Sequence, residues 1–179
     1  RKFMAENQIE LERASERYNF PPEYITAIFA MENGFKGKKN SGSLYVLNAA
    51  VTKWVFADKS KNFFYAQIRE YLNFVENREE NPFFYKGSYG IAFGLAQFIP
   101  TSLVYFVDAN GNRDDIDLYS LDDNIHSIPN YLIKHGWEGD PHDENSGAWK
   151  SIFHYCGRSE NYVKAINYMA DQLQSGGNQ

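Results

Sequence analysis

The stretch from Pro22 to Gly34, PEYITAIFAMENG, constrains this chain most, because a helix pattern carries a carboxylate on its apolar face. Pro22 suits the first turn of a helix, and Gly34 suits the residue that ends one. The stripe at helical spacing consists of Ile25, Ile28 and Phe29. Glu32 lies one turn further along it, and burial of a carboxylate is costly unless the group is paired or protonated. Two interpretations follow: a structural Glu with a buried partner, or a carboxyl that carries chemistry.

Composition indicates one globular domain and excludes several classes. The chain has 179 residues, of which 43% are hydrophobic, so we expect a single domain over residues 1–179 with a short flexible tail from about residue 175. The net charge of −5, without a basic run, argues against a nucleic-acid partner. Cys156 is the one cysteine, so no intramolecular disulfide forms. No apolar run approaches the roughly 18 residues of a membrane helix. The 17% aromatic content suits a groove that stacks on sugars.

Apolar spacing predicts an all-α fold of about eight helices, with no convincing strand pattern. Besides the opening stretch, the predicted helices cover residues 6–18, 43–57, 61–77, 122–135, 148–156 and 160–174. The inner side expected for the first is Ile9, Leu11, Ala14 and Tyr18. The inner side expected for residues 61–77 is Phe63, Phe64, Ile68, Tyr71, Leu72 and Val75.

Two glycine-rich segments interrupt these helices. Residues 34–42 form a Gly- and Lys-rich loop, which we interpret as a solvated turn or as a loop that moves over a cleft. Residues 87–100, GSYGIAFGLAQFIP, hold three glycines and are poor helix material. Ser88 and Gln97 stand there among aromatic residues. This composition suits one wall of a ligand groove, or a tight helix-packing segment.

An acidic loop at residues 108–123, DANGNRDDIDLYSLDD, alternates oxygen-bearing side chains at the spacing of the first EF-hand ligands. The pattern is irregular, because Arg113 replaces the usual Gly and Tyr119 replaces the usual bidentate Glu. The candidate ligands are Asp108, Asn110, Asn112, Asp114 and Asp123. A calcium site and an acidic turn that caps the next helix both remain open.

Other catalytic signatures are missing from the sequence. There is no GxGxxG, GxxxxGK[ST], HExxH, CxxC or GxSxG. The four histidines are scattered and are more typical of surface or capping positions: His126, His135, His142 and His154. Glu32 is therefore the one carboxylate expected in an apolar setting. We expect Ile28, Phe29, Met31 and Phe35 to surround it and raise its pKa.

Five motifs together resemble the lytic murein transglycosylases of the membrane-bound B type, which have a lysozyme-like core. They are PPEYITAIFAMENGFKG, KGSYGIAFGLAQFIPTS, VDANGNRDDIDLYSLDDNI, SIPNYLIKHGW and HYCGRSENYVKAI, in the family's order from about residue 8 to 173. The resemblance implies an all-α, lysozyme-like catalytic domain over residues 1–179. One departure is Cys156, where the family has Asn.

The resemblance also implies roles for individual residues. Glu32 matches the single catalytic acid/base, and Ser88 matches a residue beside the reacting sugar. Gln97 and Tyr131 match residues that hold the glycan, and Tyr155 and Tyr162 match aromatic residues near the carboxyl group. The acidic loop covers the family's EF-hand-like site for structural calcium, and the chemistry itself needs no cofactor.

The activity implied is cleavage of the MurNAc-GlcNAc β-1,4 bond of peptidoglycan with formation of 1,6-anhydro-MurNAc, by one Glu that acts as acid and then as base. Two rivals are a lysozyme-type hydrolase that uses water and a non-catalytic peptidoglycan-binding protein. The expected partner is the glycan strand, and the expected state is a monomer. The expected place is the bacterial periplasm or cell envelope, with an export signal that is not in this sequence.

Overall fold

The computed structural model describes residues 1–35 and 42–175, and its fold is predominantly helical. The elements are α1 (Lys2–Glu6), α2 (Gln8–Tyr18), α3 (Pro22–Asn33), β1 (Leu44–Tyr45), α4 (Val46–Phe56), α5 (Lys61–Asn77), β2 (Lys86–Gly87), the 3₁₀ helix η2 (Pro100–Tyr105), α6 (Leu121–Lys134), α7 (Gly147–Tyr155) and α8 (Glu160–Ser175). Within the described residues this makes eight α-helices, which confirms the predicted all-α class.

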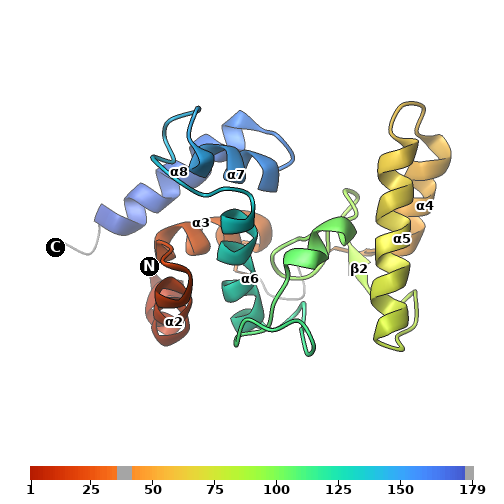
Figure 1. Cartoon of the computed structure of the whole chain (residues 1–179), viewed down its shortest axis with the longest axis horizontal. Helices are drawn as coiled ribbons and strands as arrows, with labels where there is room; N and C mark the ends of the chain where they lie inside the picture. Colours follow the sequence, from red (N-terminus) through yellow and green to blue (C-terminus); the bar gives the residue numbers. More distant parts are fainter. Residues whose placement is uncertain (36–41, 176–179) are drawn as a thin grey trace.

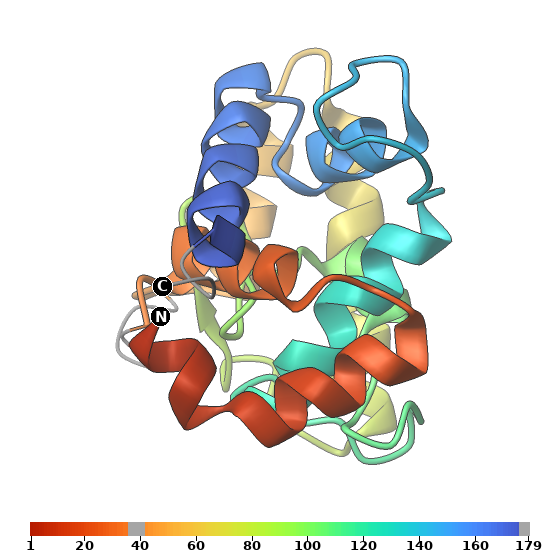
Figure 2. The same ribbon diagram turned by 90° about the vertical axis from the view of Figure 1, so that its left-hand side faces the viewer.

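The helices form two groups joined by an irregular segment (Figure 1). One group holds α2, α3, α6, α7 and α8, in which α3 packs against α8 and α2 lies beside α6. The other group is the antiparallel pair α4 and α5. The segment with β2 and η2 lies between them, and Figure 2 shows α8 passing across α3 from the side.

The predicted first helix, residues 6–18, corresponds to α2, and the short helix α1 precedes it. Asn7, at φ −121° and ψ 23°, separates α1 from α2. Leu11 and Ala14 are buried as expected, but Ile9 is 76% exposed. The prediction for Ile9 is wrong because α2 buries one narrow stripe, with a spacing of three residues, and Ile9 lies outside it.

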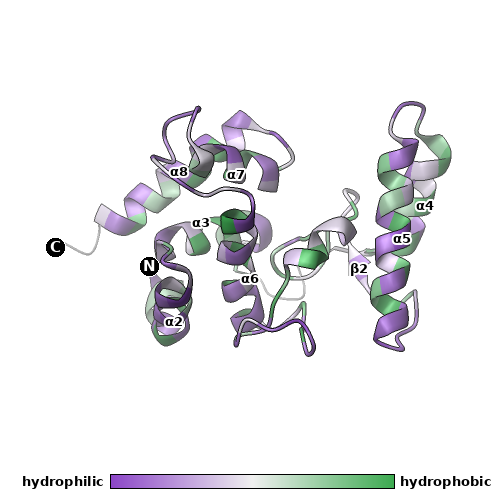
Figure 3. Ribbon diagram, in the orientation of Figure 1, coloured by the Kyte–Doolittle hydropathy of each residue, from purple (hydrophilic) through white to green (hydrophobic). Residues whose placement is uncertain are grey.

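The inner face of α5 is also narrower than predicted. Tyr71 and Val75 are buried, whereas Phe63 and Leu72 are exposed. α5 packs mainly against α4, η2 and the irregular segment that follows it, so Phe63 and Leu72 are left facing solvent. Hydrophilic and hydrophobic residues consequently alternate along this pair of helices (Figure 3). A second small core forms here from Ala49, Ala50 and Ile91.

The end of α3 and the start of α6 both lie where the sequence signals indicate. α3 ends at Gly34, whose φ of 59° is accessible to glycine without strain and whose N–H donates to Ala30 O at 2.7 Å. α6 begins after Ser120, whose Oγ accepts a hydrogen bond from Asp123 N at 3.3 Å. Pro129 lies inside α6, which continues to Lys134.

The segment after α5 is irregular, as its glycines predict. The first residues of the predicted helix 43–57 form β1 instead, which pairs antiparallel with β2. Beyond β2 the chain folds back on itself, with isolated bridges from Phe93 to Gly87 and to Phe98. This segment lies at the centre of the molecule, because Phe93, Ala96 and Phe98 are all buried.

Several expectations fall partly outside the described residues. These are the loop at 34–42, of which 36–41 are not described, and the tail, of which 176–179 are not described. Of the helices the structure does describe, none combines the length and apolar character required to cross a membrane.

Candidate active site

A cavity of about 280 Å³ opens where α3 ends, between the segment 92–102 and the helices α6, α7 and α8. Its wall contains five of the six residues predicted for catalysis and glycan binding: Glu32, Gln97, Tyr131, Tyr155 and Tyr162. These residues come from five separate parts of the chain, so the packing of α3 against α8 and of α6 against α7 helps to assemble the site.

Glu32 lies in the last turn of α3 and faces this cavity. Burial raises the pKa of its carboxyl group from 4.5 to about 7. Tyr162 Oη donates a hydrogen bond to Glu32 Oε1, which favours the ionised form and opposes part of that rise. Near neutral pH the carboxyl is thus divided between the protonated and ionised forms, as a group that both gives and takes a proton requires.

The apolar surroundings of Glu32 differ from the prediction. Ile28 and Phe29 are buried, but Met31 is 38% exposed and Phe35 is 48% exposed. The ring of Phe35 stacks on Phe3 of α1 at 4.6 Å between centroids. The cavity wall on the side of the carboxyl group is instead supplied by aromatic residues from distant helices, which periodicity within α3 cannot reveal.

Tyr131 and Tyr155 form the aromatic part of that wall. Their rings meet edge to face at 4.9 Å, and each also contacts Phe98. Tyr155 Oη donates to Ala96 O at 2.6 Å, and burial raises the pKa of Tyr131 to about 12. Both phenols therefore stay protonated at neutral pH, and their packing makes the wall rigid.

Gln97 occupies a strained backbone position in the cavity wall. Its φ of 54° lies in the left-handed region, which costs a residue other than glycine about 1–3 kcal/mol. Its Nε2 donates to Gly94 O at 2.8 Å. Neighbouring contacts hold the backbone in place, because Ala96 N donates to Asn124 Oδ1 at 2.8 Å and Leu95 N donates to Leu118 O at 3.0 Å. Strain of this kind is typical of functional positions.

Ser88 is the predicted residue that does not line the cavity. It is half-buried, and its N–H donates to Ala92 O at 2.8 Å. Ala92 does belong to the wall. Ser88 thus supports the segment beside the cavity through its backbone.

Among the wall residues not predicted as site residues, three have polar or sulfur-bearing side chains. Ser102 follows Gln97 by five positions, and its hydroxyl forms a hydrogen bond with Tyr131. His154 was interpreted as a surface or capping residue; its side chain is exposed, as that interpretation predicts, and it also borders the cavity. Cys156 Sγ donates to Phe153 O at 3.5 Å and to Ser159 O at 3.4 Å, so its thiol is engaged by the backbone.

The acidic loop binds its own backbone. Asp108 Oδ1 accepts from Asn110 N at 2.8 Å and from Asn112 N at 2.7 Å. Asp123 Oδ1 accepts from Ala109 N at 3.0 Å, and its Oδ2 accepts from Asp117 N at 2.7 Å. Throughout residues 1–35 and 42–175, no three His, Cys, Asp or Glu side chains are grouped so that they could hold a metal ion. Calcium takes six to eight oxygen ligands, which also include Asn side chains and backbone carbonyls, so the calcium site at this loop stays a prediction.

Known proteins are similar to this chain in sequence and in architecture. Residues 1–145 match the family described as Transglycosylase SLT domain. Membrane-bound lytic murein transglycosylase B of Escherichia coli (strain K12) is 33% identical over 134 residues, which cover 73% of this chain and 36% of that protein. The chain therefore spans little more than a third of the length of this relative.

Solved structures show the same fold. Soluble lytic transglycosylase SltB1 from Pseudomonas aeruginosa has a TM-score of 0.86 at 24% identity, covering 99% of this chain and 78% of that one. Escherichia coli lytic transglycosylase Slt35 in complex with calcium has a TM-score of 0.83 at 21% identity, covering 99% and 73%. Pseudomonas aeruginosa SltB3 in complex with NAG-anhNAM-pentapeptide has a TM-score of 0.80 at 20% identity, covering 97% and 62%.

The family match extends over most of the chain, including the Glu32 helix, the segment at 87–100 and the acidic loop, and the fold agrees with it from end to end. This chain belongs to the Transglycosylase SLT domain family.

Proposed function

We propose that this chain is a peptidoglycan lytic transglycosylase that cleaves the MurNAc-GlcNAc β-1,4 bond and forms 1,6-anhydro-MurNAc. The observation that carries the proposal is the position of Glu32, whose pKa burial raises to about 7 and which faces the cavity. Among the described residues of the cavity wall, Glu32 is the one carboxylic acid. Ordinary glycosidases use two carboxylates, so a site with one suits a reaction in which the substrate supplies the nucleophile.

The proposed chemistry balances with a single proton carrier. Protonated Glu32 gives its proton to the glycosidic oxygen, and the bond from that oxygen to C1 of MurNAc breaks. The ionised carboxylate then takes the proton of the C6 hydroxyl of the same sugar, and O6 bonds to C1. Glu32 ends protonated, no water is consumed and no cofactor takes part. SltB3 has been solved with a ligand that contains an anhydro sugar, which supports this product class for a chain of the same fold.

The other predicted residues have proposed roles in glycan binding. The Gln97 side chain offers an acceptor and donors for hydroxyl and acetamido groups. Tyr131, Tyr155 and Tyr162 provide apolar ring edges and neutral hydroxyls along the cavity wall. Ser88 acts from behind the wall, through Ala92.

We also propose a domain organisation, an oligomeric state and a cellular location for the enzyme. We place residues 1–179 in one catalytic domain that binds peptidoglycan glycan strands as a monomer. Such a substrate lies in the bacterial cell envelope, and the relative from Escherichia coli is named as membrane-bound. We therefore place the protein in the periplasm or elsewhere in the envelope.

The test is mass spectrometry of the products released from purified peptidoglycan sacculi by the parent chain and by Glu32→Gln. Anhydro-muropeptides from the parent alone are the expected result, with Glu32→Gln folded and inactive. Glu23→Gln, at the first turn of the same helix, is the matched control and should keep activity.

Two other outcomes would replace the proposal. Products with reducing ends would identify a lysozyme-type hydrolase that uses Glu32 with water. No products, together with sacculus binding in a pull-down, would identify a non-catalytic peptidoglycan-binding protein. Cys156, which stands where the family has Asn, would then be the first residue to restore.

A further inference from the structure

The connection between α4 and α5 carries a cluster of exposed apolar side chains. We call residues 51–65 the hairpin tip, which comprises the second half of α4, the turn after it and the start of α5. Phe56, the last residue of α4, is 80% exposed. The exposed apolar residues of the tip are Val51, Trp54, Val55, Phe56, Phe63 and Tyr65. Clusters of this kind mark surfaces that bind a partner.

The patch stays exposed because α4 is apolar on two faces. Its inner face buries Val46, Ala49 and Ala50, and the helix packs against α5 and β1. Val51, Trp54 and Val55 are three and four positions apart, so they share a second face. A helix that is apolar on more than one face is normally covered on each of them. The second face of α4 is thus free for a partner.

Lysines surround the apolar side chains of the tip. Lys53, Lys59 and Lys61 outnumber Asp58 there, whereas the whole chain carries a net charge of −5. Lys53 Nζ lies 3.8 Å from the ring centroid of Tyr89. Within residues 1–35 and 42–175, no ion pair joins any of these three lysines to a carboxylate. Their positive charges are therefore available to an anionic partner.

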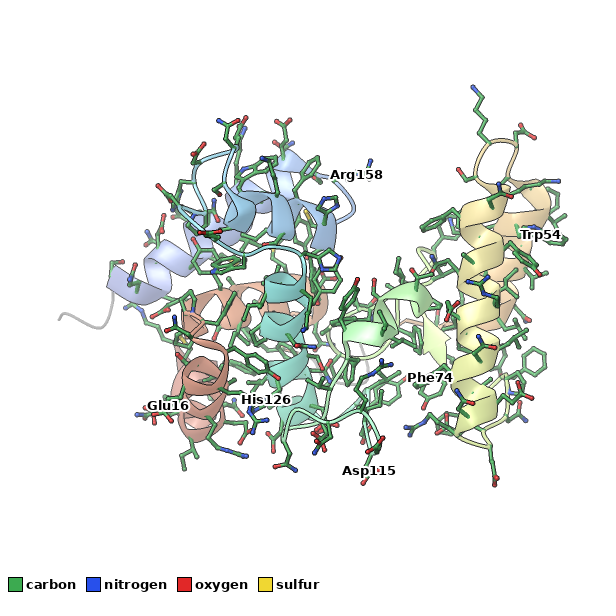
Figure 4. All side chains as sticks on the ribbon, viewed as in Figure 1. Glu16, Trp54, Phe74, Asp115, His126 and Arg158 are labelled. Atoms are coloured by element: carbon green, nitrogen blue, oxygen red, sulfur yellow. The ribbon has the colours of Figure 1, made fainter. Side chains whose placement is uncertain are left out.

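Protruding apolar side chains among lysines suit the surface of an anionic lipid bilayer. Trp and Phe enter the boundary between headgroups and acyl chains, and lysine stems reach the negative headgroups. Figure 1 shows α4 and α5 at the edge of the molecule farthest from α2 and α8, and Trp54 lies at that edge in Figure 4. A flat surface can therefore meet the tip without contact with the other helices.

We propose that the hairpin tip inserts its apolar side chains into the surface of an anionic bilayer, with its lysines on the lipid headgroups. Among the described residues that line the cavity of Glu32, none belongs to the tip. The cavity consequently stays open to substrate while the tip is docked. This binding does not depend on the activity proposed above.

The first experiment is flotation of the parent chain with lipid vesicles. The chain should float with vesicles of phosphatidylglycerol and phosphatidylethanolamine, stay behind with phosphatidylcholine vesicles, and be released by added sodium chloride. Phe56→Ser should weaken binding about tenfold or more, because the inserted ring is lost. Lys59→Gln should weaken it about fivefold. Ile9→Ser and Lys2→Gln, which change exposed residues of α2 and α1, are the matched controls and should bind like the parent.

The second experiment locates the inserted part of the chain. Vesicles with brominated acyl chains should quench the tryptophan fluorescence of the parent. Trp149 is buried and Trp137 packs against the core, so Trp54→Phe should still float but lose most of this quenching. Quenching that persists in Trp54→Phe would place another part of the chain at the bilayer and overturn the proposal.

Three further results would also overturn it. These are no flotation with the anionic vesicles, equal flotation with both kinds of vesicle, and tip variants that bind as the parent does. A dimer in light scattering that Phe56→Ser dissociates, without flotation of the parent, would assign the patch to a second copy of the chain. The tip variants should melt and turn over sacculi like the parent, so failure here is distinct from failure of the proposed activity.

Discussion

Tyr162 Oη, in the first turns of α8, donates a hydrogen bond to Glu32 Oε1 at the end of α3, across 130 residues of sequence. The bond favours the ionised carboxylate, while burial favours the protonated one, and burial is the larger effect because the pKa rises to about 7. The balance between these two effects sets the pH range in which Glu32 can give a proton.

The pH profile of turnover should report this balance. Because the first step needs protonated Glu32, kcat/KM on a soluble muropeptide should fall as the pH rises through about 7. Tyr162→Phe removes the hydrogen bond that lowers the pKa, so the falling limb should move to higher pH. Tyr168→Phe, an exposed tyrosine on the same helix, is the control. A limb that stays in place or moves to lower pH in Tyr162→Phe would contradict this role of the bond.

Glu32 should also make the folded state less stable at alkaline pH. Its pKa is raised from 4.5 to about 7, so the folded chain holds this proton where the unfolded chain has released it. Stability from this group is full below about 4.5 and is lost as the pH rises through about 7. The melting temperature of Glu32→Gln should therefore exceed that of the parent by more at pH 8 than at pH 4.5. An equal difference at both values would show that the carboxyl is not held in a desolvated site.

The stability of the folded chain at acid pH should depend on His126. This residue belongs to α6, and its side chain contacts Glu10 of α2 (Figure 4). The ring is fully buried, and its Nε2 lies 2.7 Å from Glu10 Oε1. Burial lowers the pKa of His126 from 6.5; the nearby carboxylate of Glu10 opposes this shift, and the charges of Arg17 and Arg13 add to it.

The unfolded chain therefore takes up this proton at higher pH than the folded one. Stability should be lost as the pH falls below about 6.5, and this loss should be smaller in His126→Asn. Urea unfolding of both chains at several pH values measures it. His154→Asn is the matched control, since His154 is exposed, and it should lose stability with acid like the parent. The same acid-induced loss in His126→Asn and the parent would assign the effect to other groups.

Asn124 should be the polar residue on which the segment around Gln97 depends most, although it does not itself line the cavity. Its fully buried amide accepts from Ala96 N and donates to Leu118 O and to Ser120 O. Asn124→Ala leaves the Ala96 N–H without this acceptor, so the free energy of unfolding should fall by about 2–4 kcal/mol. Asn130→Ala, which removes one bond to Tyr105 O, should lose less. Equal losses in the two variants would argue against the special position of Asn124.

The sequence by itself determined the helices and the central residue of the site. Apolar spacing identified α3 and α5 closely, and the Pro22 and Gly34 signals located both ends of α3. These features depend on interactions within a few residues, so periodicity and end signals report them directly. Glu32 was found the same way, as a carboxylate on an apolar stripe, and family resemblance then pointed to Gln97 and the three tyrosines.

Only the tertiary structure decided which of these residues share a wall. The packing of the helices leaves Ser88 out of the cavity wall, adds Ser102 and His154 to it, and leaves Phe35 exposed. It also brought Arg17 to Asn110 across 93 residues, at a loop whose local pattern resembles a calcium site. Spacing along the chain determines which face a helix presents, but contacts between distant segments depend on how those faces pack. The burial of Glu32 and the hydrogen bond from Arg17 to the acidic loop both depend on such packing between distant segments.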